Sequence, residues 1–218
     1  MVIITIFGSC RQEAIYNIPK VNVTGIRDNV TYTHNTKEVL ETIKYCKCGH
    51  LSPEKTLTTF RTPILHNRKL YYNNTLINNF NNTNVFFIEI ASRLTHQYNN
   101  VYVHHILSSN EELSKNIIIT KQTDEEIEND IINIKKELKR PIIIIGHVVT
   151  YNHGSRYELL KLLETICLKY NILFINPFKE ITMKNYNIIN LLEDDLTHYN
   201  SEGHNVMKNI YIDFLKKL

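Results

Sequence analysis

Two short segments at opposite ends of the chain carry residue types that can act together in catalysis. Asp195 and His198 lie three residues apart, just before a C-terminal segment with helical character. At that spacing the carboxylate can fix the tautomer of the imidazole, which then acts as a general base. The turn Gly8-Ser9-Cys10-Arg11 follows the apolar run 2–7 and supplies the nucleophile that such a pair requires. We therefore expect the two ends of the chain to form one site.

Cys10 is the expected nucleophile of this site. A thiol at the N-terminus of a helix and near an imidazole forms its thiolate readily, and it is the most nucleophilic side chain available at neutral pH. The turn also leaves the backbone N–H of Cys10 free to face a developing oxyanion. The alternative is a small buried Cys that ends a core strand. Ser9 is the second candidate nucleophile, because a shift of one residue would exchange the two; otherwise Ser9 is a helix N-cap.

Apolar runs and helical periods alternate along the chain and indicate how these residues are positioned. The expected strands are 2–7, 21–26, 85–90, 101–107, 141–145 and 171–175, and the expected helices are 36–45, 123–139, 156–170 and 201–218. Nearly continuous apolar strands are typical of a parallel sheet that is covered on both faces. We predict an α/β fold, a doubly wound three-layer α/β/α sandwich with a parallel, flavodoxin-like sheet, in one domain over residues 1–218.

In such sheets ligands bind beyond the carboxyl ends of the strands, where several further polar residues are expected. Arg11 and Arg93 can hold a phosphate or pyrophosphate through the planar guanidinium group, although a surface salt bridge is the alternative for each. His147 follows the strand 141–145 and is a candidate for lining the cleft. His34 precedes the helix 36–45, as a second imidazole near the site or as a solvated side chain.

Composition excludes several classes of protein. The net charge is only +3, and the basic residues are scattered among acidic ones, so we expect no nucleic-acid partner. No apolar run is long enough to cross a bilayer and no signal peptide is evident, which predicts no membrane association. Four cysteines without framework spacing suit a reducing compartment, so we expect a cytoplasmic protein, in the host cytoplasm if the source is viral. The segment Cys46-Lys47-Cys48-Gly49-His50 is too tightly spaced for a zinc hook, and we expect no metal.

The motifs of the two ends together resemble the SGNH/GDSL hydrolase superfamily. The family's first turn reads Gly-Asp-Ser with Ser as the nucleophile, and the register places Cys10 at that position. This substitution resembles the GSCFA branch and the Cys-bearing acyltransferases related to polysaccharide biosynthesis. The resemblance implies an SGNH-type sheet and an oxyanion hole to which Gly25 contributes. The family's Gly-x-Asn-Asp block is replaced by Ala91-Ser92-Arg93, so Ser92 or Arg93 would take the role of the missing Asn.

The resemblance implies an SGNH-like enzyme that acts on acyl groups. We expect an acyltransferase that moves an acetyl group from acetyl-CoA to an amino or hydroxyl group of a sugar or nucleotide-sugar in surface-glycan synthesis. The alternative is an esterase that hydrolyses acyl esters of carbohydrate or lipid with the same triad. A binding module without catalysis is the third hypothesis, and it applies if Cys10, His198 and Asp195 do not converge. The single domain is also compatible with being one part of a larger sugar-modifying protein.

Overall fold

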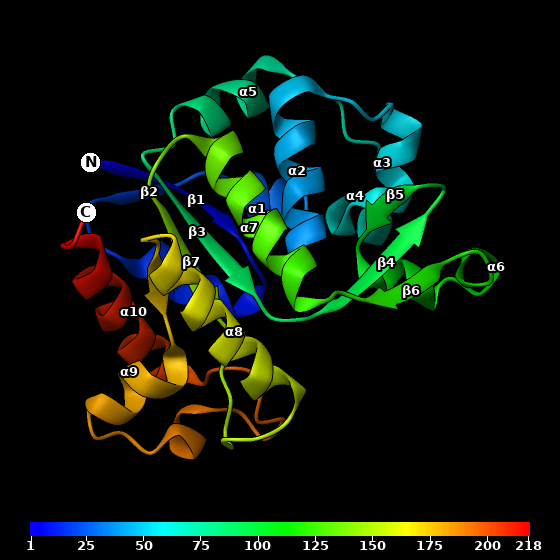
Figure 1. The fold of residues 1–218 in the computed structure, drawn as a ribbon. Helices are drawn as coiled ribbons and strands as arrows, with labels where there is room; N and C mark the ends of the chain where they lie inside the picture. The colour runs from blue at the N-terminus through cyan, green and yellow to red at the C-terminus, as the bar shows by residue number, and fades with distance from the viewer.

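The computed structural model describes residues 1–218 and contains a central sheet of five parallel strands (Figure 1). The strands lie side by side in the order β2 (Val21–Val23), β1 (Val2–Phe7), β3 (Val85–Ile90), β7 (Ile142–Gly146) and β8 (Leu173–Ile175). In this register Ile6 pairs with Phe87. Because all strands run the same way, the loops that follow them share one edge of the sheet.

Helices cover both faces of this sheet and make the three-layer α/β/α sandwich that the sequence predicts. One face carries α1 (Ile26–Asn29), α2 (Thr36–Cys48), α5 (Asn74–Asn81), α7 (Asp124–Leu138) and α8 (Ser155–Lys169), around a core cluster of 25 buried residues. The other face carries the 3₁₀ helix η1 (Cys10–Asn17), α9 (Pro177–Met183), the 3₁₀ helix η3 (Ile188–Leu191) and α10 (Ser201–Leu215), around a cluster of 21. Figure 1 shows α2, α5 and α7 on one side of the sheet and α9 and α10 on the other.

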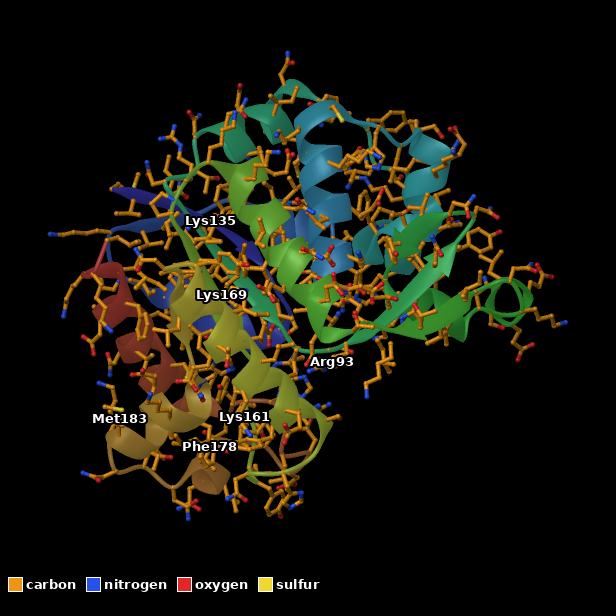
Figure 2. The ribbon with its side chains drawn as sticks, in the orientation of Figure 1. Arg93, Lys135, Lys161, Lys169, Phe178 and Met183 are labelled. Carbon is orange, nitrogen blue, oxygen red and sulfur yellow. The ribbon has the colours of Figure 1, made fainter.

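The central strands and the long helices form for reasons visible in the sequence. Every residue of β3 and β7 is buried, which explains why both strands are apolar except for Glu89 in β3. A capping box between Thr123 and Glu126 starts α7. Figure 2 labels Lys135 and Lys169, which join α7 to α8: Lys135 donates to the Tyr170 carbonyl at 2.8 Å, and Lys169 pairs with Glu128 at 2.7 Å.

A small antiparallel sheet is inserted between β3 and α7. Its presence shows that the prediction of a main-sheet strand over 101–107 is wrong. Its strands lie in the order β5 (Val101–Val103), β4 (Leu94–Tyr98) and β6 (Ile118–Lys121), and η2 (His105–Ser109) and α6 (Glu111–Ser114) follow β5. Only 101–103 of the predicted strand 101–107 is extended, and it pairs with β4 instead of the main sheet. The reason is a two-residue hairpin turn at Asn99 and Asn100, which both have positive φ angles.

Other boundaries also differ from the prediction. The strand expected over 21–26 ends at Val23, because Gly25 already caps α1. The polar run 71–84 contains α5, which buries Leu76 and Phe80. The short helices α3 (Pro53–Thr59) and α4 (Arg61–His66), together with α9, have too few turns to show a helical period in the sequence. None of the helices is both long and apolar enough to cross a lipid bilayer.

Candidate active site

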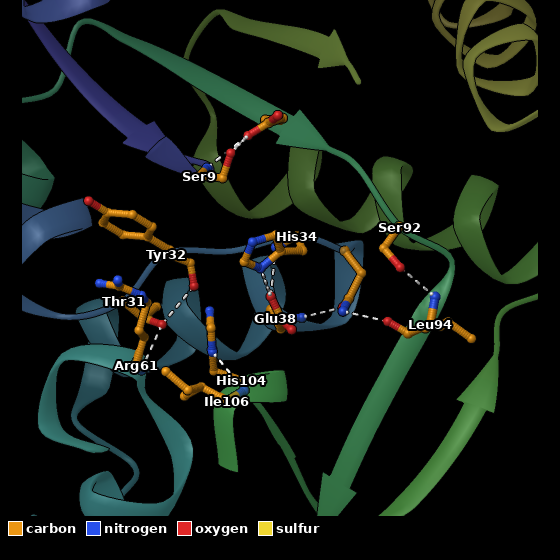
Figure 3. A network of polar contacts seen from close by, with 12 residues as sticks. Ser9, Thr31, Tyr32, His34, Glu38, Arg61, Ser92, Leu94, His104 and Ile106 are labelled. Atoms are coloured by element: carbon orange, nitrogen blue, oxygen red, sulfur yellow. Dashed lines mark hydrogen bonds and ion pairs between the residues drawn. The ribbon is translucent and has the colours of Figure 1, made fainter. Parts of the chain in front are cut away.

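The turn after β1 is fastened to a buried carboxylate on the neighbouring strand β3. Glu89 Oε2 accepts hydrogen bonds from the Ser9 backbone N–H at 2.8 Å and from the Ser9 hydroxyl at 2.6 Å. Its other oxygen, Oε1, accepts from Arg11 Nε at 2.6 Å. Figure 3 shows the two bonds between Ser9 and Glu89. The residues on either side of Cys10 are therefore held by one side chain of the core.

The charges around this turn compensate one another. Burial alone would raise the pKa of Glu89, but the Arg11 charge, His147 and the hydrogen bonds from Ser9 hold it below its usual value. His147 lies 3% exposed after β7, and burial together with the Arg11 charge lowers its pKa. At neutral pH the group thus consists of an ionised Glu89, a charged Arg11 and a neutral His147.

Ser9 and Cys10 differ in accessibility. Ser9 is 1% exposed, its hydroxyl donates to Glu89, and its oxygen caps η1 by accepting from the Arg11 N–H at 3.4 Å. Cys10 is the first residue of η1, is half-buried and forms no disulfide. A nucleophile must reach a substrate carbonyl, so the geometry favours Cys10 over Ser9 for that role.

Asp195 and His198 form a pair on the loop before α10. Asp195 Oδ1 accepts from the backbone N–H groups of Thr197 at 2.8 Å and His198 at 2.9 Å, and Oδ2 contacts His198 Nδ1. These bonds hold the pKa of Asp195 well below its usual range, with the His198 bond as the largest cause. An ionised carboxylate can only accept, so His198 Nδ1 carries the proton and Nε2 keeps a free lone pair. The pair has the geometry of a base and its orienting acid.

The loop with this pair packs against the segment that begins with Cys10. Tyr199, directly after His198, is 4% exposed; burial raises its pKa, and Glu89 and Arg11 lie close enough to influence it. On α10, the Tyr211 hydroxyl donates to Gln12 Oε1 of η1 at 2.7 Å. The structure thus brings the two ends of the chain together. It contains no hydrogen bond between the Cys10 thiol and the His198 ring.

A cavity of about 520 Å³ opens at the carboxyl edge of the sheet beside this turn. Four of the residues predicted from the sequence line it: Arg11, His34, Ser92 and His147. His34 is fixed there because its carbonyl accepts from the N–H groups of Ala91 at 2.8 Å and Ser92 at 2.9 Å. The Ser92 oxygen accepts from the Leu94 N–H at 2.9 Å, which leaves the hydroxyl proton free to donate (Figure 3).

Arg156 is a cavity residue that the sequence analysis did not select. It is the second residue of α8, and its side chain makes no hydrogen bond or salt bridge within the protein. Its pKa is lowered by burial and by the nearby Arg11 charge, while Asp195 opposes this shift. Arg156 therefore lines the cavity and is close enough to Asp195 to feel its charge. The sequence feature that could have identified Arg156 is its position after strand β7, because ligands bind beyond the carboxyl ends of such strands.

Six predicted residues do not line this cavity: Ser9, Cys10, Asp195 and His198, which are described above, and also Arg93 and Gly25. The guanidinium of Arg93, which Figure 2 labels, pairs with Asp124 at the start of α7, and this is the salt-bridge alternative. Gly25 caps α1 and lines a different, larger hollow of about 1270 Å³ between α1, α4 and α5. The larger hollow is lined by no residue of the Cys10 turn or of the Asp195–His198 loop, whereas Arg11 of that turn lines the smaller cavity, so we place the site beside the smaller cavity.

A solved structure of a G-D-S-L family protein shares this architecture. A lipolytic protein of the G-D-S-L family from Veillonella parvula superimposes with a TM-score of 0.52 at 11% identity, over 100% of both chains. A lipase/acylhydrolase from Enterococcus faecalis gives a TM-score of 0.49 at 13% identity, over 100% of this chain and 96% of that one. The acetylxylan esterase Axe2 from Geobacillus stearothermophilus gives 0.49 at 11% identity, over 97% and 92%.

The fold of the chain is therefore similar to that of the G-D-S-L family protein from Veillonella parvula. Residues 105–212 match the family described as the TviD N-terminal domain. This range includes His147, Arg156, Asp195 and His198, and it leaves out the Cys10 turn. The comparison with curated proteins finds no match.

Proposed function

We propose that the protein is an SGNH-like acyltransferase that moves an acetyl group from acetyl-CoA to a sugar or nucleotide-sugar. The observation that carries the proposal is the Asp195–His198 pair on a loop packed against the Cys10 segment. The match to the TviD N-terminal domain supports acetyl transfer in polysaccharide synthesis, because that domain is of a Vi antigen acetyltransferase.

The transfer proceeds in two steps through Cys10. His198 Nε2 takes the proton of the Cys10 thiol, and the thiolate attacks the thioester carbonyl carbon of acetyl-CoA. The bond to the CoA sulfur breaks, and CoA takes the proton from His198 as it leaves, which returns His198 to its neutral form. The acceptor hydroxyl or amine then attacks the acetyl-Cys10 carbonyl carbon while His198 Nε2 takes its proton. The Cys10 thiolate leaves, and Asp195 stabilises the imidazolium through Nδ1–H.

The cavity supplies groups suited to anionic and polar substrates. Arg11 has one nitrogen bound to Glu89, and Arg156 has no protein partner, so both have free N–H donors for phosphate oxygens. The Cys10 backbone N–H and the Ser92 hydroxyl are the donors that we assign to the oxyanion, in place of the missing Asn. His34 and His147 border the acceptor.

The test is incubation of the purified protein with acetyl-CoA, alone and with a panel of amino sugars and nucleotide-sugars. The proposal predicts release of free CoA thiol that depends on an acceptor, with a product heavier by one acetyl group. Cys10→Ala and His198→Ala should each lower the rate by about 10²-fold or more while the circular dichroism spectrum stays unchanged. Full activity in Cys10→Ala would remove Cys10 from the mechanism.

A second candidate is an esterase with the same residues. The side chains of His198 and Asp195 are 45% and 48% exposed, and such an open site admits water as the acceptor. Cleavage of a simple acetyl ester, without acceptor-dependent release of CoA, would favour this candidate.

A further inference from the structure

Four histidines meet at one side of the cavity, apart from the Asp195–His198 pair. They come from distant parts of the chain: His34 precedes α2, His96 lies on β4, and His104 and His105 follow β5. The ring centroids of His104 and His105 are 4.3 Å apart, and that of His34 lies 4.8 Å from His105 and 5.1 Å from His104. One ring nitrogen from each of these three residues lies within 4.8 Å of the other two.

Several polar atoms of this cluster are buried without a hydrogen-bond partner. They are His34 Nδ1, His96 Nδ1, His104 Nε2 and Glu38 Oε1. Buried polar groups in folded proteins are nearly always paired, so four unpaired atoms in one place call for a ligand. His104 is only 2% exposed, so its ring is largely shielded from bulk solvent.

The chemistry of the cluster suits a cation better than an anion. Each imidazole offers a ring nitrogen that can act as a ligand to a metal ion. Glu38 is 6% exposed. When it is ionised, its carboxylate can only accept hydrogen bonds, and it adds a negative charge beside the three rings.

We propose that His34, His104 and His105 bind one divalent transition-metal ion, of which Zn²⁺ is the best representative. Three imidazoles and an open fourth position are a common arrangement for zinc. His34 and His105 also line the cavity, so the open position faces the space where substrate would bind. This assignment departs from the expectation of no metal, because His34 lies too far from His104 and His105 in sequence for the three to show a ligand spacing.

Glu38 contacts the proposed ligand His34 rather than the ion itself. Its Oε2 accepts from the His34 backbone N–H at 2.6 Å and lies 3.6 Å from His34 Nδ1 (Figure 3). Metal-bound histidines commonly donate their second ring N–H to a carboxylate, which fixes the tautomer. With the ion on His34 Nε2, the proton of that ring lies on Nδ1 and points to Glu38.

His104 gives the proposal a distinct spectroscopic signature. In the structure His104 Nδ1 accepts from the Ile106 N–H at 3.1 Å, so the proton of the neutral ring is on Nε2 (Figure 3). Coordination through Nε2 moves that proton to Nδ1 and breaks the bond from Ile106. Zn²⁺ binding should therefore shift the Ile106 amide resonance.

The test measures metal binding without substrate, so its outcome does not depend on acyl transfer. Protein stripped with a chelator is titrated with Zn²⁺ and with Co²⁺, with metal content measured by mass spectrometry and cobalt coordination by visible absorption. We expect one ion per chain. His34→Ala and His105→Ala should weaken its binding by at least about 10-fold, and Glu38→Gln by about 10- to 100-fold. The Ile106 amide resonance should move on addition of Zn²⁺.

His66→Ala is the matched control, because His66 is exposed and lies in α4 away from the cluster. His105 is itself exposed, so His105→Ala should fold even where His104→Ala does not. Absence of stoichiometric binding would overturn the proposal. So would binding that His34→Ala and His105→Ala leave unchanged, which would place the ion at another site such as Cys48.

Discussion

Arg11 and Glu89 form a buried ion pair at the turn that carries Cys10, with 2.6 Å between Nε and Oε1 and side-chain exposures of 8% and 1%. Replacement of Glu89 by Gln would leave the Arg11 charge buried without a partner. We expect Glu89→Gln to lower the free energy of unfolding by about 3–5 kcal/mol, measured by urea denaturation. Glu137→Gln is the control, because Glu137 pairs with Lys47 at the surface and should cost about 1 kcal/mol or less. Equal effects of both variants would contradict the structural role of Glu89.

Chemical labelling can separate Cys10 from the other thiols. Burial raises the pKa of Cys46 and Cys167 to about 12, so at neutral pH both are unreactive. Cys48 is exposed and competes for reagent. In a Cys48→Ser background we expect iodoacetamide to modify one thiol, that of Cys10. Acyl transfer should be lost at the same rate as this thiol is modified. Prior incubation with acetyl-CoA should slow the labelling. Modified protein that retains its activity would exclude Cys10 as the nucleophile.

The layers of the fold could be predicted from the sequence because its strands are buried on both faces. The runs of β1, β3 and β7 are apolar except for Thr5 and Glu89, and this pattern is typical of a parallel sheet that helices cover on both faces. The small antiparallel sheet escaped prediction for the opposite reason. All four residues of β6 are exposed, so no alternation of apolar and polar residues marks that strand.

The candidate site was predictable only where its residues are close in sequence. The Asp195–His198 pair forms within one loop, and its three-residue spacing is visible in the chain. Glu89 was missed because it stands inside an apolar strand, where a sequence gives no sign of the Ser9 and Arg11 groups that face it. The three-histidine cluster likewise depends on contacts between segments that are far apart in sequence.

The stability of the protein should depend on pH through His147. Burial lowers its pKa in the folded state below the value of about 6.5 of an unfolded chain. Between these two pKa values the unfolded state binds one more proton, so stability falls as the pH drops below about 6.5. The measurement is the slope of the free energy of unfolding against pH between pH 4.5 and 6.5. We expect this slope to be smaller in His147→Gln than in the wild type, by up to about 1.4 kcal/mol per pH unit. The same slope in His147→Gln and in the wild type would contradict this, and His153→Gln, at an exposed site, is the control.

Arg156 should contribute to substrate binding more than to the chemical step. It lines the cavity, has no protein partner, and its charge is opposed by Arg11, so an anionic substrate would relieve the repulsion. We expect Arg156→Gln to raise the KM for acetyl-CoA by about 10-fold, with kcat changed by less than about 3-fold. Arg68→Gln, in the other hollow, should leave both constants unchanged. A fall in kcat with an unchanged KM would assign Arg156 to the transition state instead.

Gly203 sets the position of the loop that carries Asp195 and His198. A Cβ atom at this position would lie 2.1 Å from the Leu191 carbonyl oxygen and 3.1 Å from the Tyr199 Cβ. Since backbone cannot move as freely as a side chain, we expect Gly203→Ala to push the segment 191–199 away from α10. The free energy of unfolding should fall by about 1–3 kcal/mol, and acyl transfer should fall by more than the loss of folded protein explains. Asn205→Ala, at an exposed position of the same helix, should leave both properties nearly unchanged. A Gly203→Ala variant with lower stability and full activity would mean that the position of His198 does not depend on this contact.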